Sequence, residues 1–283
     1  MSIDEIHLMS NQNKVAIVIP FYKSSLTELE KISLDQCFKV LSHYPLIAIK
    51  PDSLDLSGLS FSKAFSQIVT FKDSFFKNVQ GYNALMLSSG FYQQFLDYEF
   101  ILIYQLDAFV FRDELSQWCT KGYDYIGAPW LKRNHDKTRL DAFKTKLKKR
   151  FYTFFNISKY GVPSDRQFDN RVGNGGFSLR RVQKFYSLSL KFRNEMQPYF
   201  DRNEFKFHED VFWSIEVNRK RQRLKIPSYW EALHFSFENN PERSMQLTNN
   251  QLPFGCHAWD LHTDFWKPYF ENLGFQIPLE SQS

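Results

Sequence analysis

The sequence lacks long apolar runs, and none approaches the roughly 20 residues that a membrane span requires. The segment Met1–Asn13 is polar and has neither the basic nor the apolar region of a signal peptide. Cysteine is scarce as well: Cys37, Cys119 and Cys256 are odd in number, far apart and without the paired spacing of a metal site. We therefore expect a protein of the reducing cytoplasm.

A further absence concerns phosphate binding. No Gly-x-Gly-x-x-Gly and no Gly-Lys-Ser/Thr sequence follows the first apolar segment, Val15–Ile19. These are the loops with which dinucleotide-binding folds and P-loop proteins hold phosphate. Phosphate groups would need another partner here, and a divalent metal ion is the usual one.

The residues that are present indicate an α/β fold. The 283 residues, 43% of them hydrophobic, suffice for one large domain or two small ones. Val15–Ile19 predicts a buried strand, Ser25 with Glu28 fits a capping box that begins a helix, and Leu46–Ile49 predicts a second strand. Residues 52–74 are predicted as loop and short elements. The further predictions are helices at 81–95, 114–119, 181–195 and 209–219, and strands at 100–104, 123–130, 177–179 and 232–235.

The most informative stretch is a continuously apolar run, Phe100–Tyr104, followed closely by one carboxylate, Asp107. Such a run is typical of a strand covered on both faces, and ligands of open α/β sheets bind at the carboxyl ends of strands. Oxygen ligands suit Mg²⁺ or Mn²⁺, which would neutralise a diphosphate. A lone carboxylate is equally consistent with a cap on the next turn or an ion pair with a basic residue.

Three other segments carry groups suited to chemistry. Gly173–Gly176 has three glycines in four positions, which favours a crowded backbone site, although a flexible turn is the alternative. In Glu209–Asp210 one carboxylate is a candidate general base, but acids in the first turn of a helix often serve only its dipole. His257 is either a metal ligand or a hydrogen-bonded structural residue.

The positive charge is unevenly distributed. Residues 137–150 contain seven Lys or Arg and one acid, Asp141, and the aromatic-rich Phe151–Phe155 follows. We expect the surrounding polar stretch, residues 131–170, to leave the core. It fits an anionic membrane surface, the phosphates of a nucleic acid, or a solvated basic face without a partner.

Five motifs follow one another along residues 14–260: Tyr104–Phe111, Tyr123–Trp130, Gly173–Arg180, Glu209–Trp213 and Phe254–Trp259. In this order they resemble the GT-A type of glycosyltransferase, and more closely a bacterial family of that type with Gln-Leu-Asp, Gly-Asn-Gly-Gly-Phe-Ser and Glu-Asp motifs. The opening Val15–Tyr22 is also similar to the first strand of metazoan galactosyltransferases of this fold.

The resemblance implies one GT-A-like (Rossmann-like) α/β domain with a central, mostly parallel sheet and flanking helices. Its implied parts are a nucleotide-sugar-binding half (14–130), the basic insertion (131–170), an acceptor and catalytic half (171–260) and a C-terminal tail (261–283).

The same resemblance assigns residues to roles. Pro20 and Tyr22 would contact the nucleotide, and Asn174, Gly175 and Gly176 would line the donor sugar and the acceptor. Gln105-Leu106-Asp107 takes the place of an Asp-x-Asp metal motif, with Gln105 instead of the first acid, so that Asp107 and His257 would hold Mn²⁺ or Mg²⁺. Asp210 would be the general base of an inverting transfer, and Glu209 would position the acceptor.

We therefore expect a cytoplasmic glycosyltransferase that moves a sugar from a nucleotide-sugar, UDP-sugar above all, to a hydroxyl of a glycan or lipid-linked acceptor in bacterial surface glycan assembly. No nucleic-acid partner is expected. An anionic membrane surface bound by the basic insertion would place the enzyme at the inner face of the membrane. The alternatives are a nucleic-acid-binding protein built on that insertion, and a non-catalytic membrane-surface protein that kept the fold.

Overall fold

The computed structural model describes residues 14–59, 61–132 and 138–277. The polar segment Met1–Asn13, Lys137 of the basic run and the end of the C-terminal tail lie outside these ranges. Within them, no helix is long and apolar enough to cross a membrane.

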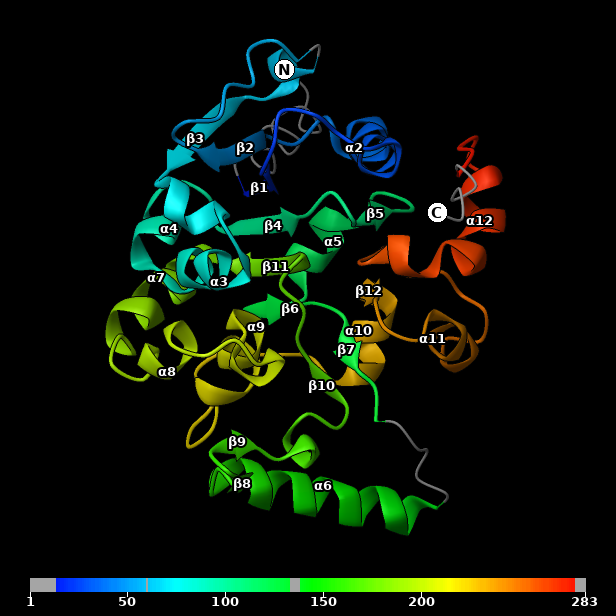
Figure 1. Ribbon diagram of the computed structural model, residues 1–283. Coiled ribbons are helices and arrows are strands. Elements are labelled where there is room, and N and C mark those ends of the chain that lie inside the picture. Colours follow the sequence, from blue (N-terminus) through cyan, green and yellow to red (C-terminus); the bar gives the residue numbers. More distant parts are fainter. Residues whose placement is uncertain (1–13, 60, 133–137, 278–283) are drawn as a thin grey trace, which may run out of the picture.

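The central sheet has six strands in the order β3-β2-β1-β4-β11-β6 (Figure 1). The pairs β1–β2, β1–β4 and β2–β3 are parallel, whereas β11 runs antiparallel to β4 and β6. The strands are β1 Val15–Pro20, β2 Leu46–Pro51, β3 Gln67–Phe71, β4 Phe100–Tyr104, β6 Tyr125–Ile126 and β11 Phe177–Arg181. This arrangement confirms the predicted α/β fold with a mostly parallel central sheet.

Strands β1 and β4 are buried on both faces because their side chains alternate between two cores. Ala16 and Val18 of β1 belong to one hydrophobic cluster, and Val15, Ile17 and Ile19 belong to the other. Side chains of α3, α4 and α7 fill the first cluster, and those of α2, α5 and α10 fill the second. These helices are α2 Glu28–Leu41, α3 Val79–Leu87, α4 Ser89–Gln93, α5 Leu115–Thr120, α7 Val182–Lys191 and α10 Tyr229–Phe235.

The C-terminal part of the chain adds a third cluster beside the sheet. It is built on the small sheet β12-β13-β5 and on α12, whose Trp266 and Phe270 are buried in it. The elements are β5 Phe109–Val110, β12 Ser236–Phe237, β13 Gly255–Cys256, α11 Pro241–Leu247, η6 Trp259–His262 and α12 Thr263–Glu271. Because β5 directly follows β4, this sheet holds the C-terminal segment against the carboxyl end of the central strand.

The predicted basic insertion leaves the core, as expected. It begins and ends at the antiparallel pair β7 Pro129–Trp130 and β10 Arg171–Val172. Between them, α6 Arg139–Phe154 and the hairpin β8 Ser158–Lys159 and β9 Val162–Pro163 lie at one end of the molecule, away from the central sheet (Figure 1). The remaining helical elements are η1 Ser62–Ala64, η2 Asp73–Phe76, η3 Asp165–Gln167, α8 Gln197–Phe200, η4 Phe205–Phe207, α9 Glu209–Val211 and the π-helix η5 Phe212–Glu216.

Several local predictions are wrong. The capping box is formed by Thr27 and Glu30, two residues beyond the predicted pair Ser25 and Glu28. Residues 232–235 are the end of helix α10, capped by Ser228, and the strand is only the two residues that follow. Residues 52–74, predicted as loop and short elements, do contain short elements, among them the edge strand β3, whose mixed exposure hid its pattern.

The predicted helices also differ in extent. Residues 81–95 form two helices, because Ser88 ends α3 and caps α4 with its hydroxyl. The helix predicted for 181–195 covers Val182–Lys191, and the one predicted for 209–219 is α9 followed by the π-helix η5.

The two-sided burial of β4 gives a test of the core. Ile103→Ala should lower the free energy of unfolding by about 2–5 kcal/mol, because the deleted atoms are fully buried and leave a cavity. Ile68→Ala on β3, where the side chain is 41% exposed, is the matched control and should cost less than about 1 kcal/mol. Urea unfolding followed by circular dichroism measures both; equal losses would contradict the assigned burial.

Candidate functional site

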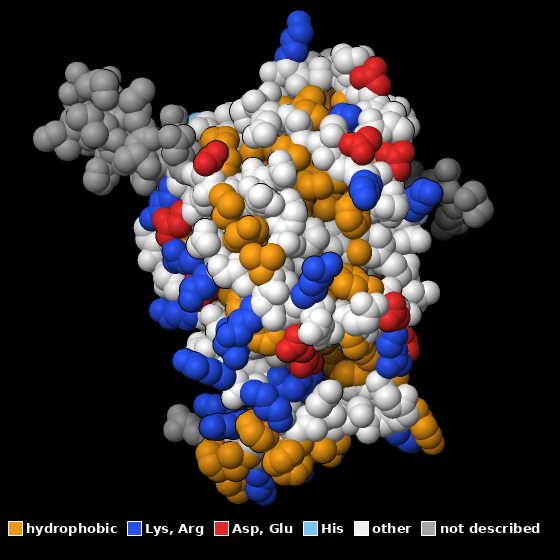
Figure 2. Space-filling model, turned by 90° about the vertical axis from the view of Figure 1, so that its left-hand side faces the viewer, with side chains coloured by type: hydrophobic (Ala, Val, Ile, Leu, Met, Phe, Trp, Pro, Cys, Tyr) orange, Lys and Arg blue, Asp and Glu red, His pale blue; other side chains and the backbone are white. Residues whose placement is uncertain are grey.

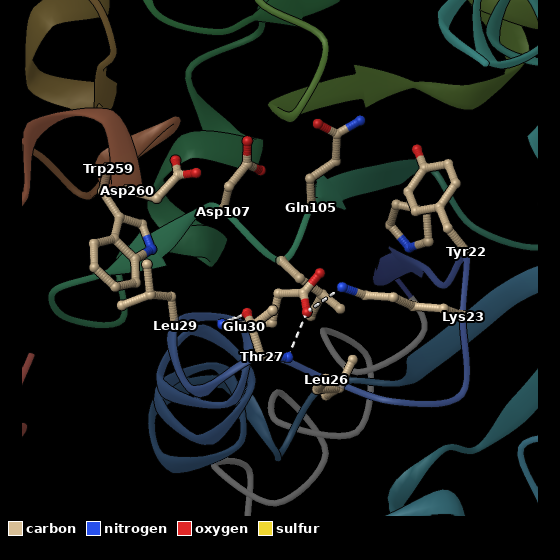
Figure 3. Close-up of a pocket in the computed structure, with 12 residues that line it drawn as sticks. Tyr22, Lys23, Leu26, Thr27, Leu29, Glu30, Gln105, Asp107, Trp259 and Asp260 are labelled. Carbon is tan, nitrogen blue, oxygen red and sulfur yellow. Dashed lines mark hydrogen bonds and ion pairs between the residues drawn. The ribbon is translucent and has the colours of Figure 1, made fainter. Parts of the chain in front are cut away.

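A pocket of about 450 Å³ lies at the carboxyl ends of the adjacent parallel strands β1 and β4. Its walls come from the loop after β1, the start of α2, the turn after β4 and η6. Four residues predicted to bind the donor, Pro20, Tyr22, Gln105 and Asp107, all line it (Figure 3). The structure therefore brings together side chains that are far apart in the sequence, at the edge where open α/β sheets bind ligands.

The β1 side of the pocket is fixed by the start of helix α2. Glu30 closes the capping box by accepting the Thr27 N–H at 2.7 Å, and the same carboxylate pairs with Lys23 Nζ at 3.0 Å (Figure 3). Tyr22 remains 45% exposed and packs its ring against Phe76, with 5.8 Å between ring centroids. The pocket thus offers an accessible aromatic ring and one ammonium group at this end.

Asp107 lines the pocket and contacts His257, which is not itself one of the lining residues. His257 Nε2 lies 3.2 Å from Asp107 Oδ1 and 3.2 Å from Gln105 Oε1. Burial by itself would raise the pKa of Asp107, but the nearby His257 outweighs it and lowers that pKa. The 3.2 Å between His257 Nε2 and Asp107 Oδ1 is an ion-pair distance. The two atoms are not aligned for a hydrogen bond, and Asp107 Oδ1 is a buried oxygen that accepts none from the described residues.

His257 is held between two carboxylates. Its Nδ1 lies 3.2 Å from Glu238 Oε1, on the side away from Asp107. Burial would lower the pKa of His257, but Asp107 and Glu238 raise it well above its ordinary value, so the ring carries a proton and donates from both nitrogens. Asn174 Nδ2 also lies 3.0 Å from Nδ1 and would donate to it only if the ring lost that proton.

Asp260 is a site residue that the sequence analysis missed. It lines the pocket beside Asp107, and Figure 3 shows the two carboxylates side by side, pointing the same way. Its Oδ1 is also a buried oxygen without a hydrogen-bond partner among the described residues. Burial and the charge of Asp107 raise the pKa of Asp260. Its position three residues after His257 was the available signal.

Within residues 14–59, 61–132 and 138–277, no group of three or more His, Cys, Asp or Glu side chains is arranged as a finished metal site. The donors near Asp107 are nevertheless of the right kind. They are two carboxylates, each with a buried oxygen that accepts no aligned hydrogen bond from the described residues, the amide oxygen of Gln105 and, once deprotonated, the imidazole of His257. Such a mixed oxygen and nitrogen set suits Mn²⁺ or Mg²⁺. The residues present therefore fit the predicted ion in chemistry.

The loop Gly173–Gly176 is a crowded backbone site, as its composition suggested. A Cβ on Gly175 would collide with Glu209 Oε1, and one on Gly176 would collide with His257 Nε2 and lie 2.5 Å from Gln105 Oε1. Asn174 is buried in a left-handed conformation with φ of 75°, and its Oδ1 accepts the Gly176 N–H at 2.8 Å. The glycines are thus required by the protein's own side chains, which approach this backbone closely.

Glu209 is held by a buried arginine. Arg180, whose guanidinium was not singled out in the sequence, donates to Glu209 Oε1 at 2.8 Å and to Oε2 at 3.1 Å, and both side chains are almost fully buried. Burial raises the pKa of Glu209 while Arg180 opposes that rise. Both carboxylate oxygens of Glu209 are therefore engaged in holding β11 against α9.

Asp210 faces a different environment. Its oxygens accept the backbone N–H groups of Val211 at 2.8 Å and Asn174 at 3.2 Å. Burial, followed by the charges of Glu209 and Glu238, raises the pKa of Asp210 to about 8. A carboxylate with such a pKa is poised to accept a proton near neutral pH.

The close contacts of the glycine loop can be tested. Gly176→Ala should lower stability by about 1–3 kcal/mol, because the new methyl group displaces His257 from its two carboxylate partners. Gly58→Ala, where a Cβ meets nothing within 4 Å, is the control and should change stability by less than about 0.5 kcal/mol. Thermal unfolding measures both variants, and a Gly176→Ala protein as stable as the control would contradict this packing.

Comparison with solved structures places this site in a known fold. The chain is similar to a galactosyltransferase, LgtC, whose crystal structure contains donor and acceptor sugar analogues. The TM-score is 0.55 at 12% sequence identity, and the match covers 94% of this chain and 98% of that chain. At this identity the likeness establishes the glycosyltransferase-type fold and leaves the chemistry to the residues of the site.

Sequence comparison gives a narrower result. No curated protein matches the sequence. A family model described as "Protein of unknown function (DUF5672)" matches residues 65–257, which contain β4, the glycine loop, the Glu209–Asp210 pair and His257. Because this match covers more than half of the chain, the protein belongs to the DUF5672 family.

Proposed function

We propose that the protein is a glycosyltransferase that moves a sugar from a nucleotide-sugar, UDP-sugar above all, to a hydroxyl group of an acceptor. The observation that carries the proposal is the pocket at the ends of β1 and β4, which Asp107 lines, together with the contacts that lead away from it. His257 contacts Asp107, and Asn174 of the glycine loop contacts both His257 and Asp210. The similarity to a galactosyltransferase fold also supports a sugar-donor site at this edge of the sheet.

The nucleotide is assigned to the Tyr22 end of the pocket. The exposed ring of Tyr22 offers a stacking surface for a base, and Pro20 shapes the adjoining wall. The diphosphate would then extend toward Asp107, with Lys23 as the ammonium group in the pocket. A volume of about 450 Å³ lies in the range of small-molecule sites.

A divalent metal would be held by Asp107 and His257, as expected from the resemblance, together with Asp260. Gln105 supplies a neutral oxygen where the first acid of an Asp-x-Asp motif would stand. The ion would neutralise the charge that develops on the departing diphosphate. His257 could ligate only after losing its proton, so metal affinity should depend on pH.

Asp210 is the proposed general base. Its carboxylate takes the proton of the acceptor hydroxyl as that oxygen attacks the anomeric carbon, and the bond from this carbon to the diphosphate oxygen breaks with its electron pair leaving on the diphosphate. Attack opposite the leaving group inverts the anomeric centre. Glu209 acts indirectly: fixed by Arg180 beneath Gly175, it holds the acceptor side of the site in place.

The proposed acceptor is a glycan or a lipid-linked glycan of bacterial surface assembly, with the reaction in the cytoplasm. Nuclear magnetic resonance of the product formed from a panel of UDP-sugars would identify the donor sugar and the anomeric configuration of the product.

Donor binding gives the first test of this function. UDP with Mn²⁺ should raise the melting temperature of the wild-type protein, and Asp107→Asn should remove most of that shift, because it removes the carboxylate proposed to hold the Mn²⁺ ion at the diphosphate. Asp52→Asn, an exposed residue after β2, is the control and should retain the full shift. If neither UDP nor any UDP-sugar changes the melting temperature, the assignment of this pocket as the donor site is wrong.

The second test concerns Asp210 and pH. Asp210→Asn should lower transfer by about 10²-fold or more while leaving the UDP-induced shift intact, because only the proton acceptor is lost. In the wild type, kcat/KM should rise with pH toward a plateau with its midpoint near the raised pKa of about 8, since only the ionised carboxylate accepts a proton.

The same pKa makes a prediction for stability. Because the pKa of Asp210 is raised, the folded state keeps a proton that the unfolded state releases. The free energy of unfolding of the wild type should therefore fall as the pH rises from the ordinary pKa of an aspartate toward about 8. The melting temperature of Asp210→Asn relative to wild type should therefore increase with pH over that interval.

For the activity test, transfer that the Asp210→Asn variant retains in full would show that Asp210 is not the general base.

A further inference from the structure

Helix α6 carries an apolar stripe that points away from the protein. Leu140, Phe143, Leu147, Phe151 and Phe154 recur at helical spacing, and their exposed fractions lie between 43% and 60%. At about 100° per residue these five side chains fall within an arc of roughly 80° on the helix. Phe155, the C-cap residue that follows α6, is exposed as well.

The polar side of α6 faces the body of the protein. Lys149 Nζ donates to the backbone oxygen of Asp169 at 2.9 Å, and the buried Thr153 accepts from Arg171 through its hydroxyl at 3.1 Å. A surface helix of a globular protein normally has the reverse orientation, with its apolar side inward. The stripe is therefore held outward by polar contacts, and a continuous apolar surface of this kind marks an interaction site.

A strongly basic pocket lies beside the stripe. It has a volume of about 800 Å³ between α6 and residues 218–230, and Phe154 belongs to both the stripe and the pocket wall. Seven Lys or Arg side chains line it, and among the described lining residues there is no Asp or Glu. Figure 2 shows the same juxtaposition: hydrophobic side chains gather at the end of the molecule where α6 lies, with Lys and Arg side chains directly above them.

The inner wall of this pocket suits an anion. Arg171 donates to the backbone oxygen of Gln167 at 3.4 Å and to the Thr153 hydroxyl, neither of which carries a charge. Burial and the neighbouring Arg219 lower the pKa of Arg171 to about 10. Arg219 itself pairs with Glu216 at 2.6 Å. A phosphate oxygen in the pocket would relieve the repulsion between the two guanidinium groups.

Charge and polarity together select the occupant. A second copy of the chain on this face would bring one basic pocket against another, and a nucleic acid would use the cations but leave the apolar stripe in water. The surface of an anionic bilayer offers an apolar boundary next to phosphate groups. We propose that α6 lies in the surface of an anionic phospholipid bilayer, with its apolar stripe at the acyl boundary and lipid phosphate in the basic pocket.

With 16 residues, α6 is too short for the roughly 20 that span a bilayer, so it lies along the interface. The hairpin β8–β9 beside it presents Tyr160, which is 90% exposed, and the Lys159 ammonium lies 5.2 Å from the Tyr160 ring centroid. Tyrosine with a neighbouring lysine is typical of the headgroup region. This membrane contact does not depend on the transfer reaction, because it uses none of the residues of the donor pocket.

Vesicle co-sedimentation of the full-length protein tests the proposal. The protein should pellet with vesicles that contain phosphatidylglycerol and remain in solution with vesicles of phosphatidylcholine alone. The double variant Leu147→Asn/Phe151→Asn should weaken binding by about tenfold or more, because two apolar anchors are lost. Lys146→Gln/Arg150→Gln should weaken it by a similar factor, since each charge near the surface contributes about 1 kcal/mol.

Matched controls lie on α7. Leu190 is 54% exposed, close to the 51% of Leu147, and Leu190→Asn should leave vesicle binding unchanged. Lys184→Gln/Lys191→Gln removes two exposed charges from the same helix and should also have no effect beyond about twofold. All these variants change exposed side chains, so their melting temperatures and their UDP-induced shifts should match those of the wild type. If a variant bound vesicles but showed no UDP-induced shift, the result would count against the proposed donor site and not against the membrane contact.

Three results would overturn the proposal. The first is equal recovery in the pellet with neutral and anionic vesicles, or none with either. The second is vesicle binding that the α6 variants leave intact. The third is another occupant: steeply salt-dependent binding of an RNA oligonucleotide without vesicle binding, or a dimer in sedimentation velocity that Leu147→Asn/Phe151→Asn dissociates.

Discussion

The site depends on one buried ion pair. Arg180 on β11 and Glu209 on α9 form two parallel hydrogen bonds in the interior, and Arg180 also donates to the Tyr92 hydroxyl at 2.9 Å and to the Gly175 carbonyl at 3.3 Å. Such a pair is expensive to desolvate, and removing one partner leaves an uncompensated charge that costs about 3–5 kcal/mol. The geometry of this pair fixes β11, α9 and the glycine loop relative to one another. This arrangement places Asp210, the residue after Glu209, beside the loop.

Around that pair the charges alternate across the site. The Arg180 guanidinium is followed by the carboxylates of Glu209 and Glu238, with Asp210 near both, and then by the His257 imidazolium and the Asp107 carboxylate. His257 balances two acids and keeps Asp107 ionised, whereas Asp210 has acidic neighbours and little compensation. The pKa of Asp107 is thereby lowered and the pKa of Asp210 is raised. Such a separation of pKa values within one site is the usual basis on which two carboxylates take different roles.

The basic insertion follows a different rule from the rest of the chain. The helices that cover the sheet bury most of their apolar side chains against it, but in α6 these side chains are turned outward and polar contacts attach the helix to the body. The pocket behind this helix is lined by Val172 of β10, and β10 leads directly into the glycine loop. The end of the molecule that carries α6 and the candidate functional site are therefore joined by one short strand.

Much of the architecture could be predicted from local pattern. The continuously apolar runs Val15–Ile19 and Phe100–Tyr104 are buried parallel neighbours, since only strands covered on both faces tolerate such runs. The errors arose where propensity and packing compete: residues 232–235 are apolar enough for a strand, but the Ser228 cap extends a helix through them. The edge strand β3 shows no clear alternation, because its outer face has little to pack against.

Neighbours along the chain are enough to predict the α/β class, the strand that ends near Asp107, the crowding of the glycine loop and the basic excursion. Four features could not be predicted in this way: Asp260 lies beside Asp107, Glu238 holds the far side of His257, Arg180 occupies both oxygens of Glu209, and α6 turns its apolar side outward. The physical reason is that charge pairing and burial depend on which distant segments meet, and these contacts are set by the packing of the whole sheet.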